Sequence, residues 1–209
     1  MPLFYQQDID DCTRLAVWKI EETEDFFLSQ VPVQREITHP HKRLQHLAGR
    51  YLLRFLFPSF PHHEIEIAST RKPFLPNDQY HFSISHCSNY AAAIVSTHCR
   101  VGIDVELVTP RLHKIKHKFL HGDELRFVNA HLPSLQQDVL TLLWSAKEAM
   151  YKWYGLGEVD FSEVMRTFPF ALNDTGIIDG CFLKEELQQK LELPFKMWEG
   201  VSLVWVNSL

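Results

Sequence analysis

A strand-like segment and a helix-like segment, about forty residues apart, constrain the fold of this chain more than any other feature. Residues 101–106 read Val-Gly-Ile-Asp-Val-Glu, and residues 144–152 read Trp-Ser-Ala-Lys-Glu-Ala-Met-Tyr-Lys. Because successive side chains of an extended strand alternate between its two faces, Asp104 and Glu106 point in the same direction. The strand therefore offers two carboxylates to whatever packs against that face.

The helix-like segment supplies a third carboxylate and a lysine. Glu148 and Lys152 lie on one face of a helix, with the acid N-terminal to the base, which is the favourable order. If the strand and the helix pack with these faces together, a hard divalent cation and a phosphate group fit between them.

Composition excludes several classes of protein. The chain has 209 residues, of which 45% are apolar and 22% charged, as in ordinary globular proteins, and its net charge of −5 argues against general nucleic-acid affinity. We expect no membrane span, because no apolar run approaches the necessary length. A reducing cytoplasm is expected, because no secretory leader is evident and no CxxC pair occurs among the four cysteines, Cys12, Cys87, Cys99 and Cys181.

Apolar residues recur at helical spacing over residues 41–57 and 138–154, and residues 111–119 also have helical character. These predict helices over residues 41–57, 111–119 and 138–154, the last ending at Gly155, a residue that suits a helix C-terminus. A polar helix is also predicted around residues 184–191.

In the helix over residues 138–154, Glu148 lies roughly opposite the apolar stripe, and Trp144 and Tyr151 flank it. Aromatic residues beside ion-forming residues predict that the second face is covered too. We therefore expect this helix to lie between two layers, with one polar seam that forms a site wall.

Short alternating segments predict strands over residues 64–68, 82–85, 91–95, 101–105, 168–172 and 201–206. The class is therefore mixed α+β. Each half combines helical and strand-like segments, which permits two similar α+β subdomains. We place their boundary near Arg100, giving an N-terminal subdomain over residues 1–100 and a C-terminal subdomain over residues 101–209.

Two groups of basic residues are open to more than one interpretation. The polar face of the helix over residues 41–57 carries Arg43, His46, Arg50 and Arg54, which we interpret as a solvated face. A second group follows the acidic strand: Arg111, Lys114, Lys116 and Lys118. In an acidic protein this local excess indicates either a docking surface for an acidic partner or an ordinary solvated helix.

An Asp-x-Glu pair in a strand is usually a solvated face or part of a salt bridge. Gly102 favours a functional role here, because glycine weakens a strand unless backbone or ligand must approach closely. Oxygen ligands at this density favour Mg²⁺ over zinc.

His86 differs from the other histidines, which lack a zinc-binding pattern and fit surface positions. It follows Ser85 at the end of a strand, and this turn could offer hydroxyl, imidazole and backbone N–H groups to a phosphate. Neither a G-x-S-x-G elbow nor a Walker loop occurs, which disfavours serine hydrolase and P-loop chemistry.

Four blocks of the sequence closely resemble the 4′-phosphopantetheinyl transferases of the Sfp type. The blocks are Lys72-Pro73, Phe82-Ser83-Ile84-Ser85-His86, Gly102 to Glu106, and Trp144 to Lys152. The resemblance implies a monomer of two pseudo-symmetric α+β halves with coenzyme A in the cleft between them. It also implies transfer of the phosphopantetheine arm of coenzyme A to a serine of an apo acyl or peptidyl carrier protein, with release of adenosine 3′,5′-bisphosphate.

The same resemblance assigns roles to individual residues. Asp104, Glu106 and Glu148 would hold Mg²⁺, for which Mn²⁺ could substitute, against the pyrophosphate. Ser85 and His86 would contact the phosphates and Lys72 the nucleotide end, with Arg43 or Lys42 as a looser candidate for the 3′-phosphate.

Chemistry supports these roles. Phosphoryl-type transfer needs positioning and charge neutralisation, which a divalent ion and a lysine supply. A serine hydroxyl also needs a base, for which we choose Glu148, while Lys152 would neutralise or protonate the departing phosphate.

Carrier proteins of this kind are small, acidic and helical, so the basic group from Arg111 to Lys118 would steer them to the site. Two alternatives stay open at this point. One is a non-catalytic module that binds a carrier protein or coenzyme A, although all four catalytic positions are retained. The other is a Mg²⁺-dependent phosphohydrolase acting on a nucleotide.

Overall fold

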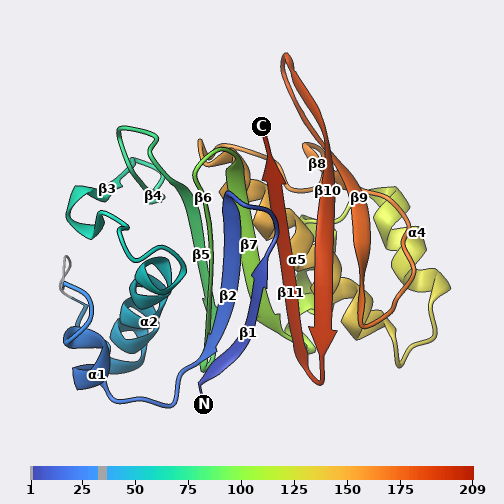
Figure 1. Ribbon diagram of the computed structural model, residues 1–209. Coiled ribbons are helices and arrows are strands. Elements are labelled where there is room, and N and C mark those ends of the chain that lie inside the picture. The colour runs from blue at the N-terminus through green and yellow to red at the C-terminus, as the bar shows by residue number, and fades with distance from the viewer. Residues whose placement is uncertain (1, 33–36) are drawn as a thin grey trace.

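Two antiparallel sheets pack against each other, and each carries one long helix on its outer face (Figure 1). The computed structural model describes residues 2–32 and 37–209. Its mixture of helices and antiparallel strands confirms the predicted α+β class.

The first sheet has the strand order β1-β2-β6-β5. Its strands are β1 (Leu3–Asp8), β2 (Thr13–Lys19), β5 (His81–Cys87) and β6 (Tyr90–Ser96). The long helix α2 (Pro40–Leu56) packs against the sheet through an apolar cluster, and the short helix α1 (Glu24–Leu28) lies beside α2. The N-cap of α2 is His39, whose ring accepts the backbone N–H of Lys42, and Pro40 occupies the first turn, where its missing N–H costs nothing.

The connection between α2 and β5 is irregular. It contains a 3₁₀ turn (His62–Glu64) and a small ladder of β3 (Glu66–Ile67) and β4 (Pro73–Phe74). The loop after β3 brings Lys72 against the C-terminus of the second long helix, as described below.

The second sheet has the strand order β7-β11-β10-β9-β8. Its strands are β7 (Arg100–Leu107), β8 (Met165–Thr167), β9 (Thr175–Lys184), β10 (Leu187–Trp198) and β11 (Val201–Ser208). The helices of this half are α3 (Arg111–Ile115), a 3₁₀ turn (Lys116–Lys118), α4 (Gly122–Ala130) and α5 (Gln136–Tyr154).

The helix α5 is covered on two sides, as its sequence predicts. Met150 and Trp153 join an apolar cluster with the second sheet, whereas Leu140 and Leu143 join a cluster with α3 and α4. The helix ends at Gly155, which adopts a left-handed conformation with a φ of 75°.

Alternate residues of β7 face different layers. Val101, Ile103 and Val105 are buried in the cluster between the two sheets. Gly102 faces α5 so closely that an added Cβ would lie 2.0 Å from the carbonyl oxygen of Ala149. This close approach is the reason for glycine in the strand, and it brings the acidic face of β7 against α5.

Two predicted elements are wrong. Residues 184–191 form no helix but belong to the hairpin of β9 and β10, with Glu185 at a positive φ of 54° between the strands. Although Lys, Glu, Gln and Leu favour helices, pairing with β9 outweighs that local preference. Residues 168–172 lie outside any strand, because β8 ends at Thr167.

None of the helices in the described ranges is both long and apolar enough to cross a membrane. The division into subdomains at residues 100 and 101 and their pseudo-symmetry stay predictions.

Candidate active site

Asp104 is the centre of a hydrogen-bonded cluster that joins β5, β7 and α5. Its Oδ1 accepts hydrogen bonds from Lys152 Nζ at 2.7 Å and from Ser85 Oγ at 2.8 Å. Lys152 Nζ also donates to Ser85 Oγ at 2.9 Å. The carboxylate is almost fully buried, and among the described residues no donor reaches its Oδ2. The strand and helix predicted from the sequence therefore do pack with their polar faces together.

Glu106 lies on the same face of β7 as Asp104, as strand alternation requires. Its Oε2 accepts a hydrogen bond from Cys87 Sγ at 3.1 Å, and its Oε1 accepts one from Trp144 Nε1 at 3.4 Å. Burial and the charge of Asp104 raise the pKa of Glu106. Cys87 was not predicted as a site residue, because neither its type nor its spacing distinguishes it from an ordinary buried thiol.

Glu148 faces the other two acids from α5. Burial raises the pKa of Glu148 to about 7, with the charges of Asp104 and Glu106 adding to the rise and Lys152 opposing it. Of the described residues, none donates a hydrogen bond to its carboxylate. The strand and helix thus gather three acids and one lysine into one electrostatically coupled group.

The described residues contain no group of three or more His, Cys, Asp or Glu side chains arranged to hold a metal ion. Ligation of a cation by Asp104, Glu106 and Glu148 therefore stays a prediction. The donor set nevertheless fits a hard cation, because all its atoms are carboxylate oxygens. A cation would also satisfy the buried Oδ2 of Asp104 and relieve the repulsion among the acids.

Lys72 and Arg43 already have partners. Lys72 Nζ donates to the carbonyl oxygen of Lys152 at 2.6 Å, so it binds the C-terminal turn of α5. The Arg43 guanidinium forms two hydrogen bonds of 2.7 Å with the carboxylate of Glu24, and a third to the carbonyl of Ile37. The structure does not bring Arg43 into the acidic cluster.

The interpretation of Arg50 as part of a solvated face is wrong. Arg50 is only 5% exposed, and its Nε and Nη1 have no acceptor among the described residues. Burial lowers its pKa to about 10. It lines a cavity of about 300 Å³ together with Arg71, Ile84 and His86. An arginine at this position of a helix gives no sequence signal, since its burial depends on the loop that covers it.

A second cavity of about 230 Å³ reaches Lys152 itself. It lies between the loop around Thr70 and Arg71, the strand residue Ser83, and Tyr151 on α5. The two cavities share Arg71, Pro73 and Ile84, so a continuous wall leads from the buried Arg50 to the cluster around Asp104.

A buried ion pair holds α5 from its other side. Lys147 is fully buried, and its Nζ donates to Glu124 Oε2 at 2.6 Å and to the carbonyl oxygens of Phe161 and Met165. Glu124 also accepts from the backbone and hydroxyl of Thr167. These bonds connect α4, α5 and β8, and they fix the turn that carries Glu148.

Residues 100–197 match the model of the 4′-phosphopantetheinyl transferase superfamily. The chain is also 30% identical over 173 residues to the 4′-phosphopantetheinyl transferase AcpT of Escherichia coli O157:H7, a match that covers 80% of this chain and 85% of AcpT. The chain belongs to this superfamily. Its members are transferases.

Two further relatives of the superfamily match over shorter ranges. The 4′-phosphopantetheinyl transferase gsp of Aneurinibacillus migulanus is 31% identical over 113 residues, covering 53% of this chain and 46% of gsp. Enterobactin synthase component D of Salmonella austin is 30% identical over 118 residues, covering 53% of this chain and 47% of that protein. The chain thus spans about half the length of these two relatives but most of the length of AcpT.

Proposed function

We propose that this protein transfers the 4′-phosphopantetheine group of coenzyme A to a serine hydroxyl of an apo acyl or peptidyl carrier protein, releasing adenosine 3′,5′-bisphosphate. The observation that carries the proposal is the cluster in which Asp104 accepts hydrogen bonds from Lys152 and Ser85, with two further acids beside it. Membership of the superfamily agrees with it. Assignment to the Sfp type is part of the same proposal.

Glu148 is the proposed general base. Its pKa of about 7 suits a group that must be ionised to accept a proton near neutral pH and must then hold that proton. It would take the proton of the carrier serine while the serine oxygen attacks the phosphorus next to pantetheine. The bond from that phosphorus to the bridging oxygen breaks, and adenosine 3′,5′-bisphosphate departs with the bridging oxygen.

Lys152 is the proposed partner of the departing phosphate. Its ammonium, which is partly exposed, already lies between Asp104 and Ser85, where it can neutralise the charge that develops on the leaving oxygen. Ser85 and His86 would contact the phosphates from β5. Lys72 Nζ donates to the carbonyl oxygen of Lys152 at the end of α5, so its proposed contact with the nucleotide requires that this hydrogen bond be replaced by one to the nucleotide.

Mg²⁺ would be held by Asp104, Glu106 and Glu148, and when bound it neutralises the pyrophosphate. The cavity beside Arg50 is the proposed place for the nucleotide end of coenzyme A. A buried guanidinium with two nitrogens that lack acceptors favours a phosphate there. Because Arg43 is bound to Glu24, we assign contact with the 3′-phosphate to Arg50 instead of Arg43.

The carrier protein would dock beside the cluster. The four cations Arg111, Lys114, Lys116 and Lys118 follow β7 directly, and none of them forms an ion pair with a described residue. Their charges are therefore available to an acidic partner. A monomer in the cytoplasm remains our proposal for the working state, and the four cysteines are free thiols in agreement with a reducing compartment.

The decisive experiment is mass spectrometry of an apo carrier protein incubated with this protein, coenzyme A and Mg²⁺. A gain of the phosphopantetheine mass, lost in the presence of EDTA and restored by added Mg²⁺, is expected. Cleavage of coenzyme A without modification of the carrier would instead identify a phosphohydrolase. Binding of coenzyme A without either reaction would identify a non-catalytic module.

A further inference from the structure

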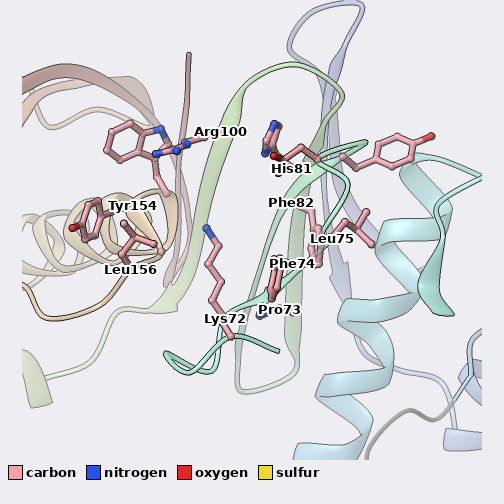
Figure 2. A pocket seen from close by; sticks show the side chains of 14 residues that line it. Lys72, Pro73, Phe74, Leu75, His81, Phe82, Arg100, Tyr154 and Leu156 are labelled. Carbon is pink, nitrogen blue, oxygen red and sulfur yellow. The ribbon is translucent and has the colours of Figure 1, made fainter. Parts of the chain in front are cut away.

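A cavity of about 380 Å³ adjoins the smaller cavity that reaches Lys152. Figure 2 shows its two walls: Tyr154 and Leu156 at the C-terminal end of α5 on one side, and Phe74 and His81 from the β4–β5 region on the other, with Lys72 extending between them. None of the proposed catalytic or metal-binding residues lines it, although Lys72, which is proposed to contact the nucleotide end of coenzyme A, does. Its other lining residues have no role in the proposed transfer.

Two cationic side chains, Lys72 and Arg100, line this cavity together with His81, whose pKa is lowered by burial. Arg100 forms no ion pair in the part of the chain that the structure describes. Burial lowers the pKa of Lys72 to about 8, and the charge of Arg100 adds to the fall. Asp78 also lines the cavity and partly offsets this charge at His81. The local balance is nevertheless positive, although the chain as a whole is acidic.

The cavity also contains a hydrogen-bond donor without an acceptor. Trp153 is 2% exposed and lines the cavity, and its indole Nε1 has no partner among the described residues. A buried N–H group that lacks an acceptor costs free energy, because it has lost its hydrogen bond to water and forms none with the protein. A ligand oxygen that reached this N–H, which is closed to solvent in the structure, would remove that cost.

Apolar side chains form the rest of the surface. Phe74, Leu75 and Phe82 lie on one wall and Leu156 on the other, and Leu156 remains 68% exposed. A large aliphatic side chain exposed at the mouth of a cavity offers a contact that a ligand can cover. The site therefore combines anion-binding groups with an apolar surface of small-molecule size.

We propose that this cavity is a second binding site, which takes a small organic anion with a carboxylate or phosphate at one end and an aromatic or branched aliphatic group at the other. Arg100 and Lys72 pair with the anionic group, the Trp153 indole donates to the ligand, and Phe74 and Leu156 cover its apolar end. This cavity shares Lys72, Pro73, Phe82 and Gly155 with the cavity that reaches Lys152, and Lys72 also binds the carbonyl of Lys152.

The test uses two anionic probes, 3-phenylpropionate and phenyl phosphate, and follows the indole N–H signals of the ¹⁵N-labelled full chain by NMR. The signal of Trp153 is identified by its loss in the variant Trp153→Phe. We expect a saturable shift of this signal with at least one probe, and their relative affinities distinguish a carboxylate site from a phosphate site. Neutral 3-phenyl-1-propanol and ring-free propionate should each bind at least about ten-fold more weakly.

A charge variant and a matched control locate the site. Arg100→Gln should weaken binding of the better probe about ten-fold, because one charge-assisted contact is lost. Arg126→Gln changes an exposed arginine on α4 and should leave binding unchanged. Thermal unfolding of each variant shows whether it is folded. Equal binding by Arg100→Gln, or equal binding of the neutral alcohol, would overturn the proposal.

Coenzyme A separates this proposal from the proposed transferase activity. The probe should still shift the Trp153 signal at saturating coenzyme A, because Arg100, Trp153 and Leu156 line this cavity but neither the cavity beside Arg50 nor the one that reaches Lys152. Displacement of the probe by coenzyme A would show that the cavity belongs to the coenzyme A site and would reject a second site. Failure of the carrier-protein assay would leave the probe measurement unaffected.

Discussion

At the scale of single residues, the candidate site combines groups that are unfavourable to the folded state when nothing is bound. Three acids lie close enough together for Asp104 and Glu106 to raise the pKa of Glu148, and Asp104 leaves one oxygen buried without a donor. Such arrangements cost stability and persist where a ligand or a reaction uses them. This is the physical reason to place the chemistry here rather than at another acidic pair.

Glu148→Gln should abolish transfer without unfolding the protein. The amide is nearly the same size as the carboxylate but cannot accept the serine proton, so we expect kcat to fall at least about 100-fold. The unfolding temperature of the metal-free protein should stay equal or rise, because repulsion with Asp104 and Glu106 is removed. Steady-state kinetics and thermal unfolding measure the two effects.

A near-normal rate for this variant would remove Glu148 from the mechanism. The control is Glu192→Gln, which changes an exposed acid on β10 and should alter neither kcat nor the unfolding temperature. If both variants lose activity equally, the effect belongs to net charge rather than to the site.

His62 makes stability depend on pH. Burial lowers its pKa to about 4, with the charges of Arg50 and Arg54 adding to the fall. Between about pH 6.5 and pH 4, His62 is therefore protonated in the unfolded chain but neutral in the folded protein. The free energy of unfolding consequently falls as the pH drops through this range. His62→Gln should remove on the order of 1 kcal/mol of this pH dependence.

Urea unfolding at several pH values measures the effect. The neighbouring variant His63→Gln is the matched control, because the side chain of His63 is 82% exposed, and its stability curve should follow the wild-type curve. Parallel curves for His62→Gln and wild type would contradict the assignment of this acid sensitivity to His62.

At the scale of elements, the seam between β7 and α5 decides the geometry of the site. Asp104 and Lys152 meet because Gly102 lets the strand approach the helix backbone. Gly102→Ala should destabilise the protein by about 3 kcal/mol or more, because the atoms its Cβ would meet are backbone atoms of Ala149 and Trp153 that cannot move aside.

Denaturant unfolding compares this variant with Gly122→Ala. At Gly122 the nearest atom to an added Cβ is Arg126 Nη1 at 3.7 Å, so the change should stay within about 0.5 kcal/mol of wild type. Similar stabilities for the two variants would contradict the close approach of β7 to the α5 backbone at Gly102.

The buried pair of Lys147 and Glu124 holds α5 on its opposite side. Lys147→Met should cost about 3–5 kcal/mol, because it leaves the Glu124 carboxylate buried without its cation. Adding Glu124→Leu in the same chain should recover part of that loss in denaturant unfolding. A double variant less stable than Lys147→Met alone would show that the other bonds of Glu124 matter more than the ion pair.

At the scale of the whole molecule, an acidic protein presents a basic surface beside its candidate site. Replacing Lys114 and Lys116 by Glu should raise the KM for an acidic carrier protein, and leave the KM for coenzyme A unchanged, because these residues lie outside the acidic cluster. The KM for the carrier with the wild-type protein should also rise with salt, since exposed charges are screened.

Initial-rate kinetics with each substrate varied in turn checks this prediction. The control is a double variant of two lysines in the β9–β10 hairpin, the half-buried Lys184 and the exposed Lys190, each replaced by Glu, which has the same change of net charge. Equal effects on both KM values, or equal effects of the two double variants, would reject a docking role for α3 and the turn after it.

Local pattern identified the main helices and the acidic strand. The apolar spacing in α2 and α5, Gly155 at the end of α5 and the alternation of β7 are properties of neighbouring residues, so the sequence predicts them correctly. It also indicated that Asp104 and Glu106 share a face. The sequence predicts a helix around residues 184–191, where the structure has the hairpin of β9 and β10, because these residues favour helices. Only pairing between the strands outweighs that local preference.

Residues distant in sequence meet only in the folded chain, so the tertiary structure decided which of these side chains contact one another. Arg43 and Arg50 lie on one helix and are the same residue type, yet Glu24 binds the first while the second is buried at a cavity wall. Lys72 binds the end of α5, and Cys87 reaches Glu106. The sequence by itself determined which side chains are available and on which face of an element each lies, because periodicity is local. Packing between elements determined which of them meet, because burial and pairing depend on contacts that no local pattern encodes.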